Sequence, residues 1–275
     1  VSVDKSDREL SGQISLTNPR IFDSEYSLGG TLYANDYDWR TYKERSYGFS
    51  TTLGRKLTRN LSASLTYNIE QSKVTLKDDE LRNINKDTGK EIYREGKAIK
   101  SAITPALTYN STDDYYLPRR GIIASTSFEI AGLGGDMDFV KNRTNFNYYL
   151  GLREYIDYDL ILRYKASFGK IWERGYTPIN ERLYLGGIRS LRGYESRTVS
   201  PKVKYNGDYY EYGGEISFNN SVEMSFPIIE RVKMRGVVFY DYGTVGKDEQ
   251  NENKMINRSS VGTGIEWITP IGPLQ

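Results

Sequence analysis

Residues 61–70 have the sequence LSASLTYNIE, in which apolar and polar side chains alternate along the whole stretch. A period of two residues is typical of a β-strand, because successive side chains of a strand point to opposite faces. Helical spacing is scarce, so the sequence predicts an all-β fold. The same alternation recurs along the chain, and it predicts strands at residues 10–17, 26–35, 45–55, 60–76, 97–110, 120–131, 138–153, 158–171, 209–227, 231–245 and 258–269.

Two observations indicate that the apolar faces of these strands point outward to lipid. Most of the strands exceed the roughly 5–6 residues of soluble sheets and reach the roughly 9–11 residues that a tilted membrane strand requires. Aromatic residues gather at the strand ends, as in the interfacial girdles of membrane barrels; they are Tyr26, Tyr33, Tyr109, Tyr148, Tyr149, Trp172, Tyr240, Tyr242 and Trp267. The predicted fold is therefore a transmembrane antiparallel β-barrel, with an outer face that includes Leu65, Leu160, Leu162 and Ile265 and a lumen that includes Asn145, Arg163 and Lys165.

The connections between the predicted strands fall into two lengths. Short links alternate with long polar ones, of which residues 77–96 and 173–208 are the longest. This alternation is typical of outer-membrane barrels, whose long loops lie outside the cell. Residues 77–96 are almost entirely charged or polar, so we expect them to form a mobile loop without an apolar anchor.

Composition excludes several classes of function. The chain has neither cysteine nor histidine, which excludes disulfides, thiolate and imidazole metal sites and Ser-His-Asp catalysis. Its 38 basic and 36 acidic residues are interspersed, so no nucleic-acid surface is expected. We therefore expect no enzyme activity, no cofactor and no metal. The alternative fold is a soluble β-sandwich, in which the apolar faces would point inward.

The middle of the longest loop carries apolar residues and glycines, with the sequence LYLGGIRSLRGY at residues 183–194. A solvated loop has no need of such residues, so we expect this segment to fold back into the barrel. The alternation of two later strands turns Glu223 and Asp241 into the lumen. An arginine on the inserted loop is a natural partner for two carboxylates that would otherwise repel each other. The alternative is that water alone solvates both carboxylates.

Several segments resemble, in the same order, the barrel of the BamA family of outer-membrane assembly insertases, which is part of a superfamily of barrel insertases and polypeptide transporters. They are ISLTNPRIFDSEYSLGGTLY at 14–33, YYLPRRGIIASTSFEIAGLGGD at 115–136, LYLGGIRSLRGY at 183–194, SVEMSFPI at 221–228, FYDYGTVG at 239–246 and GTGIEWITPIGP at 262–273. In that family an Arg-Gly-aromatic motif lies on the sixth extracellular loop, inside the lumen, and its arginine contacts acidic residues of two neighbouring strands. The resemblance therefore implies a loop-docking cluster made of Arg192, Gly193, Tyr194, Glu223 and Asp241.

The family barrel has sixteen strands, and the resemblance implies that residues 1–275 are its C-terminal transmembrane domain, incomplete at both ends and without the periplasmic POTRA repeats. It implies assembly and insertion of β-barrel proteins into the outer membrane by strand templating at a lateral seam, without cofactor or ATP. The implied partners are unfolded outer-membrane proteins as substrates, accessory lipoproteins of the assembly machinery, and the lipid bilayer.

Two alternative functions stay open. A two-partner-type secretion transporter of the same superfamily would pass an unfolded polypeptide through the pore. A passive porin would owe an anion preference to basic residues of its lumen; these are Lys141, Arg143, Arg163, Lys165, Lys233 and Arg235.

Overall fold

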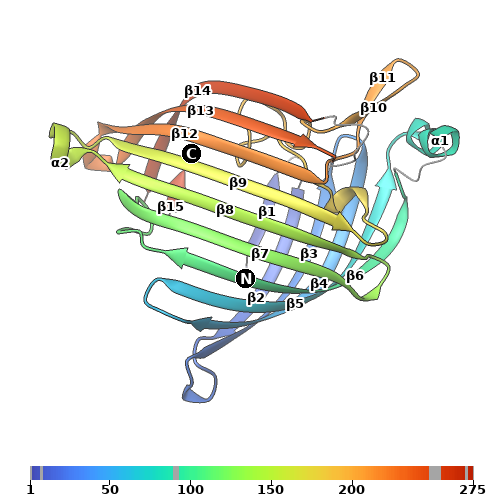
Figure 1. Cartoon of the computed structure of the whole chain (residues 1–275), viewed down its shortest axis with the longest axis horizontal. Helices are drawn as coiled ribbons and strands as arrows, with labels where there is room; N and C mark the ends of the chain where they lie inside the picture. Colours follow the sequence, from blue (N-terminus) through green and yellow to red (C-terminus); the bar gives the residue numbers. More distant parts are fainter. Residues whose placement is uncertain (1, 7–8, 89–92, 248–254, 270–271, 275) are drawn as a thin grey trace.

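The computed structural model describes residues 2–6, 9–88, 93–247, 255–269 and 272–274 of the chain. Thirteen strands form one antiparallel sheet, and their order in the sheet follows the sequence. Figure 1 shows this sheet curling into the wall of a barrel. In the described part of the chain the two edge strands, β1 and β15, do not pair with each other, so the wall is open. The strands are β1 (Ser2–Ser6), β2 (Glu9–Asn18), β3 (Tyr26–Asp38), β4 (Tyr42–Lys56), β5 (Leu61–Leu76), β6 (Gly96–Asn110), β7 (Arg120–Gly135), β8 (Phe139–Gly151), β9 (Ile161–Glu173), β12 (Ile216–Ile229), β13 (Met234–Gly246), β14 (Ile256–Thr269) and β15 (Gly272–Leu274).

All of the strands predicted from the alternation are present, and the one at residues 209–227 departs most from its predicted start. Residues 209–227 do not form a single strand, because β12 begins at Ile216. The preceding residues belong to a separate hairpin of β10 (Lys202–Tyr205) and β11 (Asp208–Glu211). The break falls at Gly213, whose φ of 78° leaves the extended conformation.

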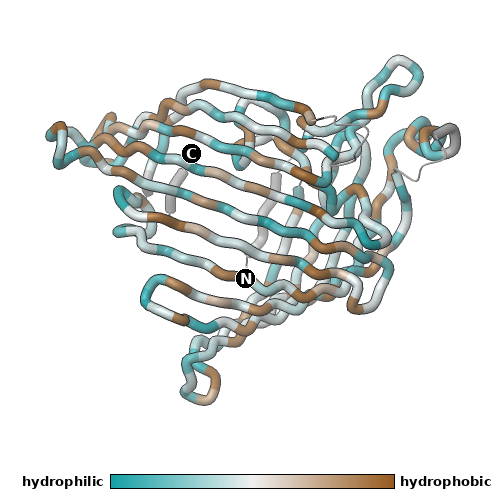
Figure 2. The backbone as a smooth tube through the Cα atoms, viewed as in Figure 1, coloured by the Kyte–Doolittle hydropathy of each residue, from teal (hydrophilic) through white to brown (hydrophobic). Residues whose placement is uncertain are grey.

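The apolar faces of the strands point outward, as predicted. Leu65 and Ile265 expose 43% and 60% of their surface, whereas Arg163 exposes 6%. Figure 2 shows the alternation as short hydrophilic and hydrophobic segments that follow one another along the strands. The arrangement is that of a membrane barrel and not of a sandwich with an apolar core.

Two aromatic residues of the predicted interfacial girdle and one basic residue of the predicted lumen lie elsewhere. Tyr33 faces the lumen, where its hydroxyl donates to Glu70 at 2.7 Å. Tyr149 also faces the lumen, because it is paired with Arg163 in the sheet. Lys233 does not line the lumen; it follows the short 3-10 helix η3 (Glu230–Val232) at a φ of 53°, in the turn before β13. The period of two holds only inside the strands, so it does not predict the side-chain direction of a residue in a turn, such as Lys233.

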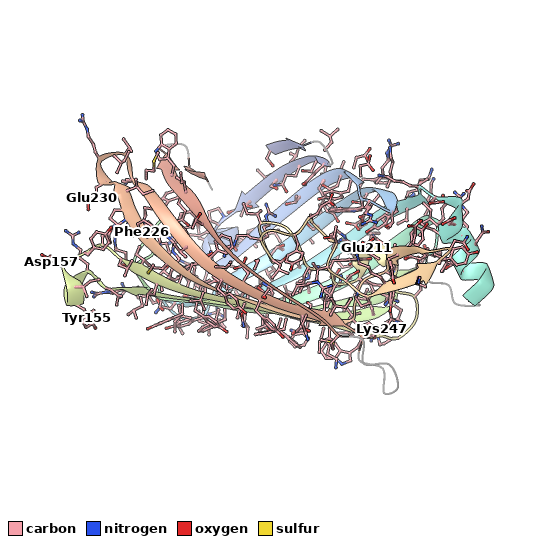
Figure 3. All side chains as sticks on the ribbon, turned by 90° about the horizontal axis from the view of Figure 1, so that it is seen from above. Tyr155, Asp157, Glu211, Phe226, Glu230 and Lys247 are labelled. Atoms are coloured by element: carbon pink, nitrogen blue, oxygen red, sulfur yellow. The ribbon has the colours of Figure 1, made fainter. Side chains whose placement is uncertain are left out.

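The turns and the long loops lie at opposite ends of the barrel. Figure 3 places Tyr155, Asp157 and Glu230 at one end and Glu211 and Lys247 at the other. The first end also carries η1 (Ile21–Asp23) and α2 (Arg153–Ile156), and the second carries α1 (Asp79–Thr88) and η2 (Ile179–Glu181). Within the described ranges no helix is both long enough and apolar enough to cross a membrane.

The charged loop at residues 77–96 is anchored, contrary to prediction. Its residues 79–88 form α1, and Leu81 and Ile84 of this helix are fully buried. Tyr93 is 1% exposed and packs in the same apolar cluster, together with Tyr42 of β4. An i, i+3 pair of apolar residues is enough to bury one side of a short helix, even when its other residues are polar. Residues 89–92 of the loop lie outside the described part of the chain.

Candidate functional site

The long loop between β9 and β12 folds into the barrel, as its apolar middle predicted. Leu183, Leu185 and Leu191 expose 8%, 3% and 0% of their surface. They pack with inward-facing side chains of the wall, among them Phe139 of β8 and Val245 of β13. Burial of each such side chain stabilises the docked loop by about 1.5–3 kcal/mol. The loop is therefore part of the interior of the barrel.

A tight turn presents the Arg-Gly-Tyr motif to the wall. The amide of Leu191 donates to the carbonyl of Gly187 at 3.1 Å, and the amide of Gly187 donates to the carbonyl of Tyr194 at 2.8 Å. Gly186 has a φ of 110°, and a Cβ there would lie 2.2 Å from the carbonyl oxygen of Glu195. The turn therefore requires a glycine at this position.

Arg192 binds two carboxylates of neighbouring strands at once. Its Nη1 lies 2.8 Å from Oε1 of Glu223 on β12, and its Nη2 lies 2.6 Å from Oδ1 of Asp241 on β13. Its Nε and its backbone amide both donate to Oδ2 of Asp241, at 2.8 and 3.1 Å. The two carboxylates are 2% and 1% exposed, so the ion pairs are poorly screened by water.

The other predicted members of the cluster also lie at this wall. The Arg192 guanidinium stacks 3.5 Å from the ring centre of Phe239, on the same strand as Asp241. The hydroxyl of Tyr194 donates to the carbonyl of Ser259 on β14 at 3.2 Å. Gly193 adopts a φ of 84°, which lets the chain turn between the arginine and the tyrosine. The structure thus brings Arg192, Gly193, Tyr194, Glu223 and Asp241 together.

Three charged residues extend the cluster beyond its predicted members. Lys165 places Nζ 2.9 Å from Oε2 of Glu223. Arg163, which lies opposite Glu223 in the sheet, donates through Nη2 to Glu266 at 2.9 Å. Arg192, Lys165 and Arg163 therefore face Glu223, Asp241 and Glu266, so the charges in this part of the lumen balance. The alternation placed both β9 cations in the lumen but gave no reason to pair them with Glu223.

A second anchor holds the same loop to the opposite part of the wall. Glu181 of η2 is 8% exposed and forms ion pairs with Lys100 of β6 and Lys141 of β8. Glu129 of β7 and Glu70 of β5 also pair with Lys100, at 3.1 and 3.8 Å. Sequence analysis did not find this anchor, because no local pattern links a loop glutamate to lysines on two distant strands. The loop is consequently attached to β6 and β8 at one point and to β12 and β13 at another.

Arg197 adds a third attachment near the extracellular end. Its Nη2 donates to the hydroxyl of Tyr42 at 2.8 Å. Its guanidinium also lies 3.9 Å from the ring centre of Tyr184 and 4.7 Å from that of Trp39. A guanidinium on aromatic faces stays stabilised after it leaves water.

The periplasmic end has an ion-pair group of its own, away from the loop. Asp159 accepts two hydrogen bonds from Arg119, both at 2.9 Å, and a third from Nη1 of Arg235 at 2.6 Å. The hydrogen bonds from Arg119 lower the pKa of Asp159 to about 2. Arg235 therefore links β13 to the turn before β9 instead of lining an open pore.

The loop cluster has a structural role, because its ion pairs hold the loop against the wall. We call the ion-paired group of Arg192, Glu223 and Asp241 the latch. Each of its carboxylates is bound by a cation, and the arginine holds them through a planar, bidentate contact. Within the described ranges no group of three His, Cys, Asp or Glu side chains is placed to hold a metal ion. What the arrangement does is fix a long loop between two parts of a membrane-embedded wall.

Comparisons with known proteins agree with this architecture. The Omp85 superfamily domain matches residues 1–275. The chain is 28% identical over 267 residues to the outer membrane protein assembly factor BamA of Nitratidesulfovibrio vulgaris, covering 95% of this chain and 32% of that protein. It is 27% identical to the human sorting and assembly machinery component 50 homolog, covering 80% of this chain and 45% of that protein. The crystal structure of BamA from Haemophilus ducreyi lacking POTRA domains 1-3 matches with a TM-score of 0.81 at 23% identity, over 98% of this chain and 58% of that one. The chain thus spans less than half the length of either curated relative.

Proposed function

The chain belongs to the Omp85 superfamily, and from this premise we propose that the protein assembles β-barrel proteins and inserts them into the outer membrane, where this barrel lies. Two relatives in different organisms carry assembly in their names, as an outer membrane protein assembly factor and as a sorting and assembly machinery component. The substrates on this proposal are unfolded outer-membrane proteins. Accessory lipoproteins and the surrounding bilayer are the further partners.

The observation that carries the proposal is the double ion pair of Arg192 with Glu223 and Asp241. A loop that is ion-paired to two separate parts of the wall does more than narrow a channel, because it ties distant strands together. A loop fixed to two parts of the wall keeps the wall rigid while a substrate strand pairs with a sheet edge by β-augmentation. Such pairing needs neither cofactor nor ATP, because main-chain hydrogen bonds drive it.

Most of the basic residues predicted to line the lumen are already paired or lie outside it, and Arg143 is the exposed exception, which argues against a porin. Lys141 and Lys165 are bound to Glu181 and Glu223. Arg163 is bound to Glu266, and Lys233 lies in a turn outside the lumen. Anion selectivity requires positive charge that an ion can reach. A secretion transporter needs a path through the lumen for an unfolded polypeptide, and the loop that two separate sets of ion pairs hold there narrows that path.

The first test is insertion of a reporter barrel into lipid vesicles by the full-length protein. We expect Arg192→Ala to lower the insertion rate by tenfold or more, since removing one partner of a buried ion pair typically costs about 3–5 kcal/mol and both carboxylates here are almost fully buried. Arg192→Lys should restore only part of the rate, because an ammonium cannot bind two carboxylates with a planar fork.

The matched control is Arg189→Ala. Arg189 is an exposed arginine of the same loop and makes no ion pair or hydrogen bond in the described part of the chain. The Arg189→Ala protein should insert the reporter at the wild-type rate. An Arg192→Ala protein that inserts as fast as this control would remove the loop from the mechanism, and export of an unfolded reporter without its insertion would favour the secretion transporter.

A further inference from the structure

The membrane-facing side of the barrel carries a row of three basic residues where β4, β5 and β6 reach the extracellular end. Arg45 lies opposite Lys73 in the β4–β5 register, and Lys73 lies opposite Lys97 in the β5–β6 register. All three side chains are exposed. They share their face with Phe49 and Ile69, so the row stands at the edge of the apolar, lipid-facing surface.

No acidic residue in the described part of the chain fully neutralises the positive charge of Lys73 and Lys97. Like charges directly opposite each other destabilise a sheet. Arg45 is paired with Asp36 at 2.8 Å, but Lys97 has no ion pair or hydrogen bond within the described ranges. The acidic neighbour of Lys73 is Glu95, which Arg82 already binds through Nε and Nη2 at 2.9 and 3.1 Å. The pair Lys73–Lys97 therefore favours an anion.

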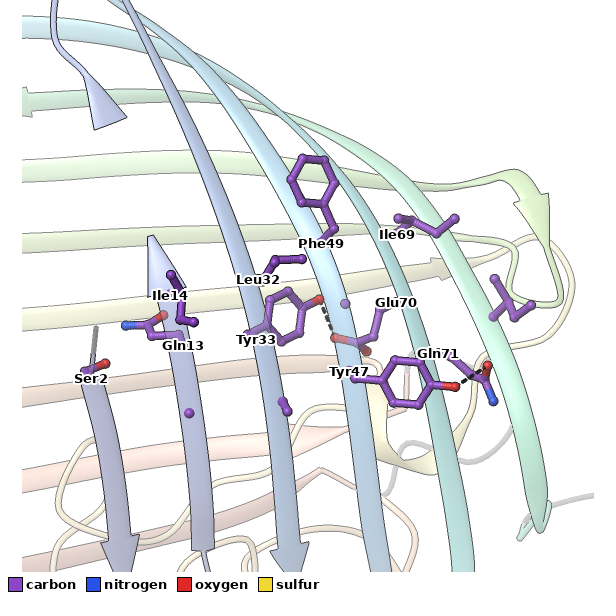
Figure 4. A pocket seen from close by; sticks show the side chains of 14 residues that line it. Ser2, Gln13, Ile14, Leu32, Tyr33, Tyr47, Phe49, Ile69, Glu70 and Gln71 are labelled. Atoms are coloured by element: carbon purple, nitrogen blue, oxygen red, sulfur yellow. Dashed lines mark hydrogen bonds between the residues drawn. The ribbon is translucent and has the colours of Figure 1, made fainter. Parts of the chain in front are cut away.

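An apolar hollow of about 790 Å³ adjoins this row on the same face. Its lining includes Tyr47, Gln71 and Ile99, each two residues along its strand from Arg45, Lys73 and Lys97. Two residues of a strand span about 6.5 Å, so the cations lie one step beyond the rim of the hollow. Figure 4 shows the hollow with its apolar side chains and the hydrogen bond from the Tyr47 hydroxyl to Gln71, which is 2.7 Å long. The outward-facing part of the lining includes Ile14, Leu32, Phe49 and Ile69, and small residues such as Gly12 and Ala34. Gln13, Tyr33 and Glu70 of the same strands, whose side chains are on the lumen face, border it as well.

We propose that this surface binds a phosphorylated lipid of the extracellular leaflet. The headgroup phosphate lies on Lys73 and Lys97, and one acyl chain of the same lipid lies in the hollow. Ammonium groups bind phosphate as point charges, and basic residues at a membrane surface attract anionic headgroups. A free phosphate ion would use the lysines alone, so the apolar hollow beside them identifies the ligand as a lipid. The site depends on the location of the barrel in the membrane and not on the proposed insertion activity.

The experiment uses the full-length protein in phosphatidylcholine nanodiscs that contain dioleoylphosphatidic acid as the probe. Native mass spectrometry counts the phosphatidic acid that stays on the released protein. We expect Lys73→Gln/Lys97→Gln to lower its retention about tenfold or more, because each basic residue near an anionic lipid strengthens binding several-fold. The single variant Lys97→Gln should show a smaller loss in the same direction, and it loses no described contact of the fold.

The matched control is Lys56→Gln/Lys204→Gln, which removes the same charge elsewhere. Lys56 is exposed and ends β4 on the side away from Arg45, and Lys204 lies on the β10–β11 hairpin. Its retention of phosphatidic acid should match the wild type. Equal retention by the control and by both the single and double lysine variants would overturn the site.

A variant whose side chain fills the hollow distinguishes a lipid ligand from a phosphate ion. A Cβ at Gly12 meets no atom within 4 Å, so Gly12→Leu places an apolar side chain in the hollow without moving the backbone. We expect this variant to lose phosphatidic acid while it still carries both lysines. Unchanged retention in Gly12→Leu, together with displacement of the lipid by inorganic phosphate, would show a site for the ion alone and would contradict the proposal.

Discussion

Arg192 directs one guanidinium at two carboxylates, and its shape explains why the sequence places an arginine there. The Nε and Nη2 atoms form a bidentate contact with Asp241, and Nη1 remains for Glu223. Lysine can offer three hydrogen-bond donors, but they radiate from one atom and cannot match two planar carboxylates. The specificity of the latch therefore resides in geometry as much as in charge.

Glu181 gives a second prediction at the residue scale. Glu181→Gln leaves Lys100 and Lys141 without their shared carboxylate, although Glu129 stays 3.1 Å from Lys100. Uncompensated buried charge costs up to about 3–5 kcal/mol, and the remaining Glu129 and Glu70 should reduce that cost. We expect the Glu181→Gln barrel to unfold in detergent at a lower midpoint concentration of guanidinium chloride than the wild type. Asp208→Asn, on the exposed hairpin, serves as control, and an equal midpoint for both variants would argue against the second anchor.

At the scale of single elements, the alternation of residues predicted the sheet well and its interruptions poorly. The period of two is set by the strand itself, so the strands and the inward position of Glu223 and Asp241 could be read from neighbouring residues. The separate β10–β11 hairpin could not, because its residues continue the alternation of β12 up to the break at Gly213. The ion-pair partners of Glu181 could not be predicted either, because Lys100 and Lys141 lie on separate strands and come close to Glu181 only in the curved sheet.

Helix α1 gives a prediction at this scale. Leu81 and Ile84 are fully buried, and they anchor a helix that is otherwise polar. Replacing a buried leucine by a small residue typically costs about 2–5 kcal/mol, which here should loosen the helix and leave the barrel intact. We expect Leu81→Ser to speed protease cleavage within residues 79–88. Asn83→Ser changes an exposed position of the same helix and should cleave as slowly as the wild type. Equal cleavage of both variants would mean that the anchor has no effect.

The turn before β9 gives a prediction about pH. Asp159 has a pKa lowered to about 2 by the hydrogen bonds from Arg119, whereas an unfolded aspartate has a pKa of about 3.9. A lowered pKa stabilises the fold above the unfolded value, and that stabilisation disappears as the pH falls through the folded value. The difference in unfolding midpoint between wild type and Asp159→Asn should hold from about pH 7 to 5 and shrink between about pH 4 and 2. A difference already lost at pH 5 would contradict this assignment.

At the scale of the whole molecule, the loop connects parts of the wall that are distant in sequence. Its Glu181 end is fixed to β6 and β8, and its Arg192 end to β12 and β13. The extracellular elements also contact one another, since the Tyr93 hydroxyl donates to the carbonyl of Glu211 at 3.0 Å. Local alternation predicted which residues face the lumen, but only the three-dimensional structure shows that this loop spans the lumen from β6 and β8 to β12 and β13.

The most direct test of this account is the accessibility of the loop residue next to Arg192. Leu191 is fully buried, and the chain has no cysteine, so Leu191→Cys introduces a single thiol. A membrane-impermeant maleimide should label this thiol slowly on the otherwise wild-type barrel and at least about tenfold faster when Arg192→Ala is added, because the latch then opens. Rapid labelling in the presence of Arg192, or equally slow labelling in its absence, would show that the ion pair does not hold the loop in the lumen.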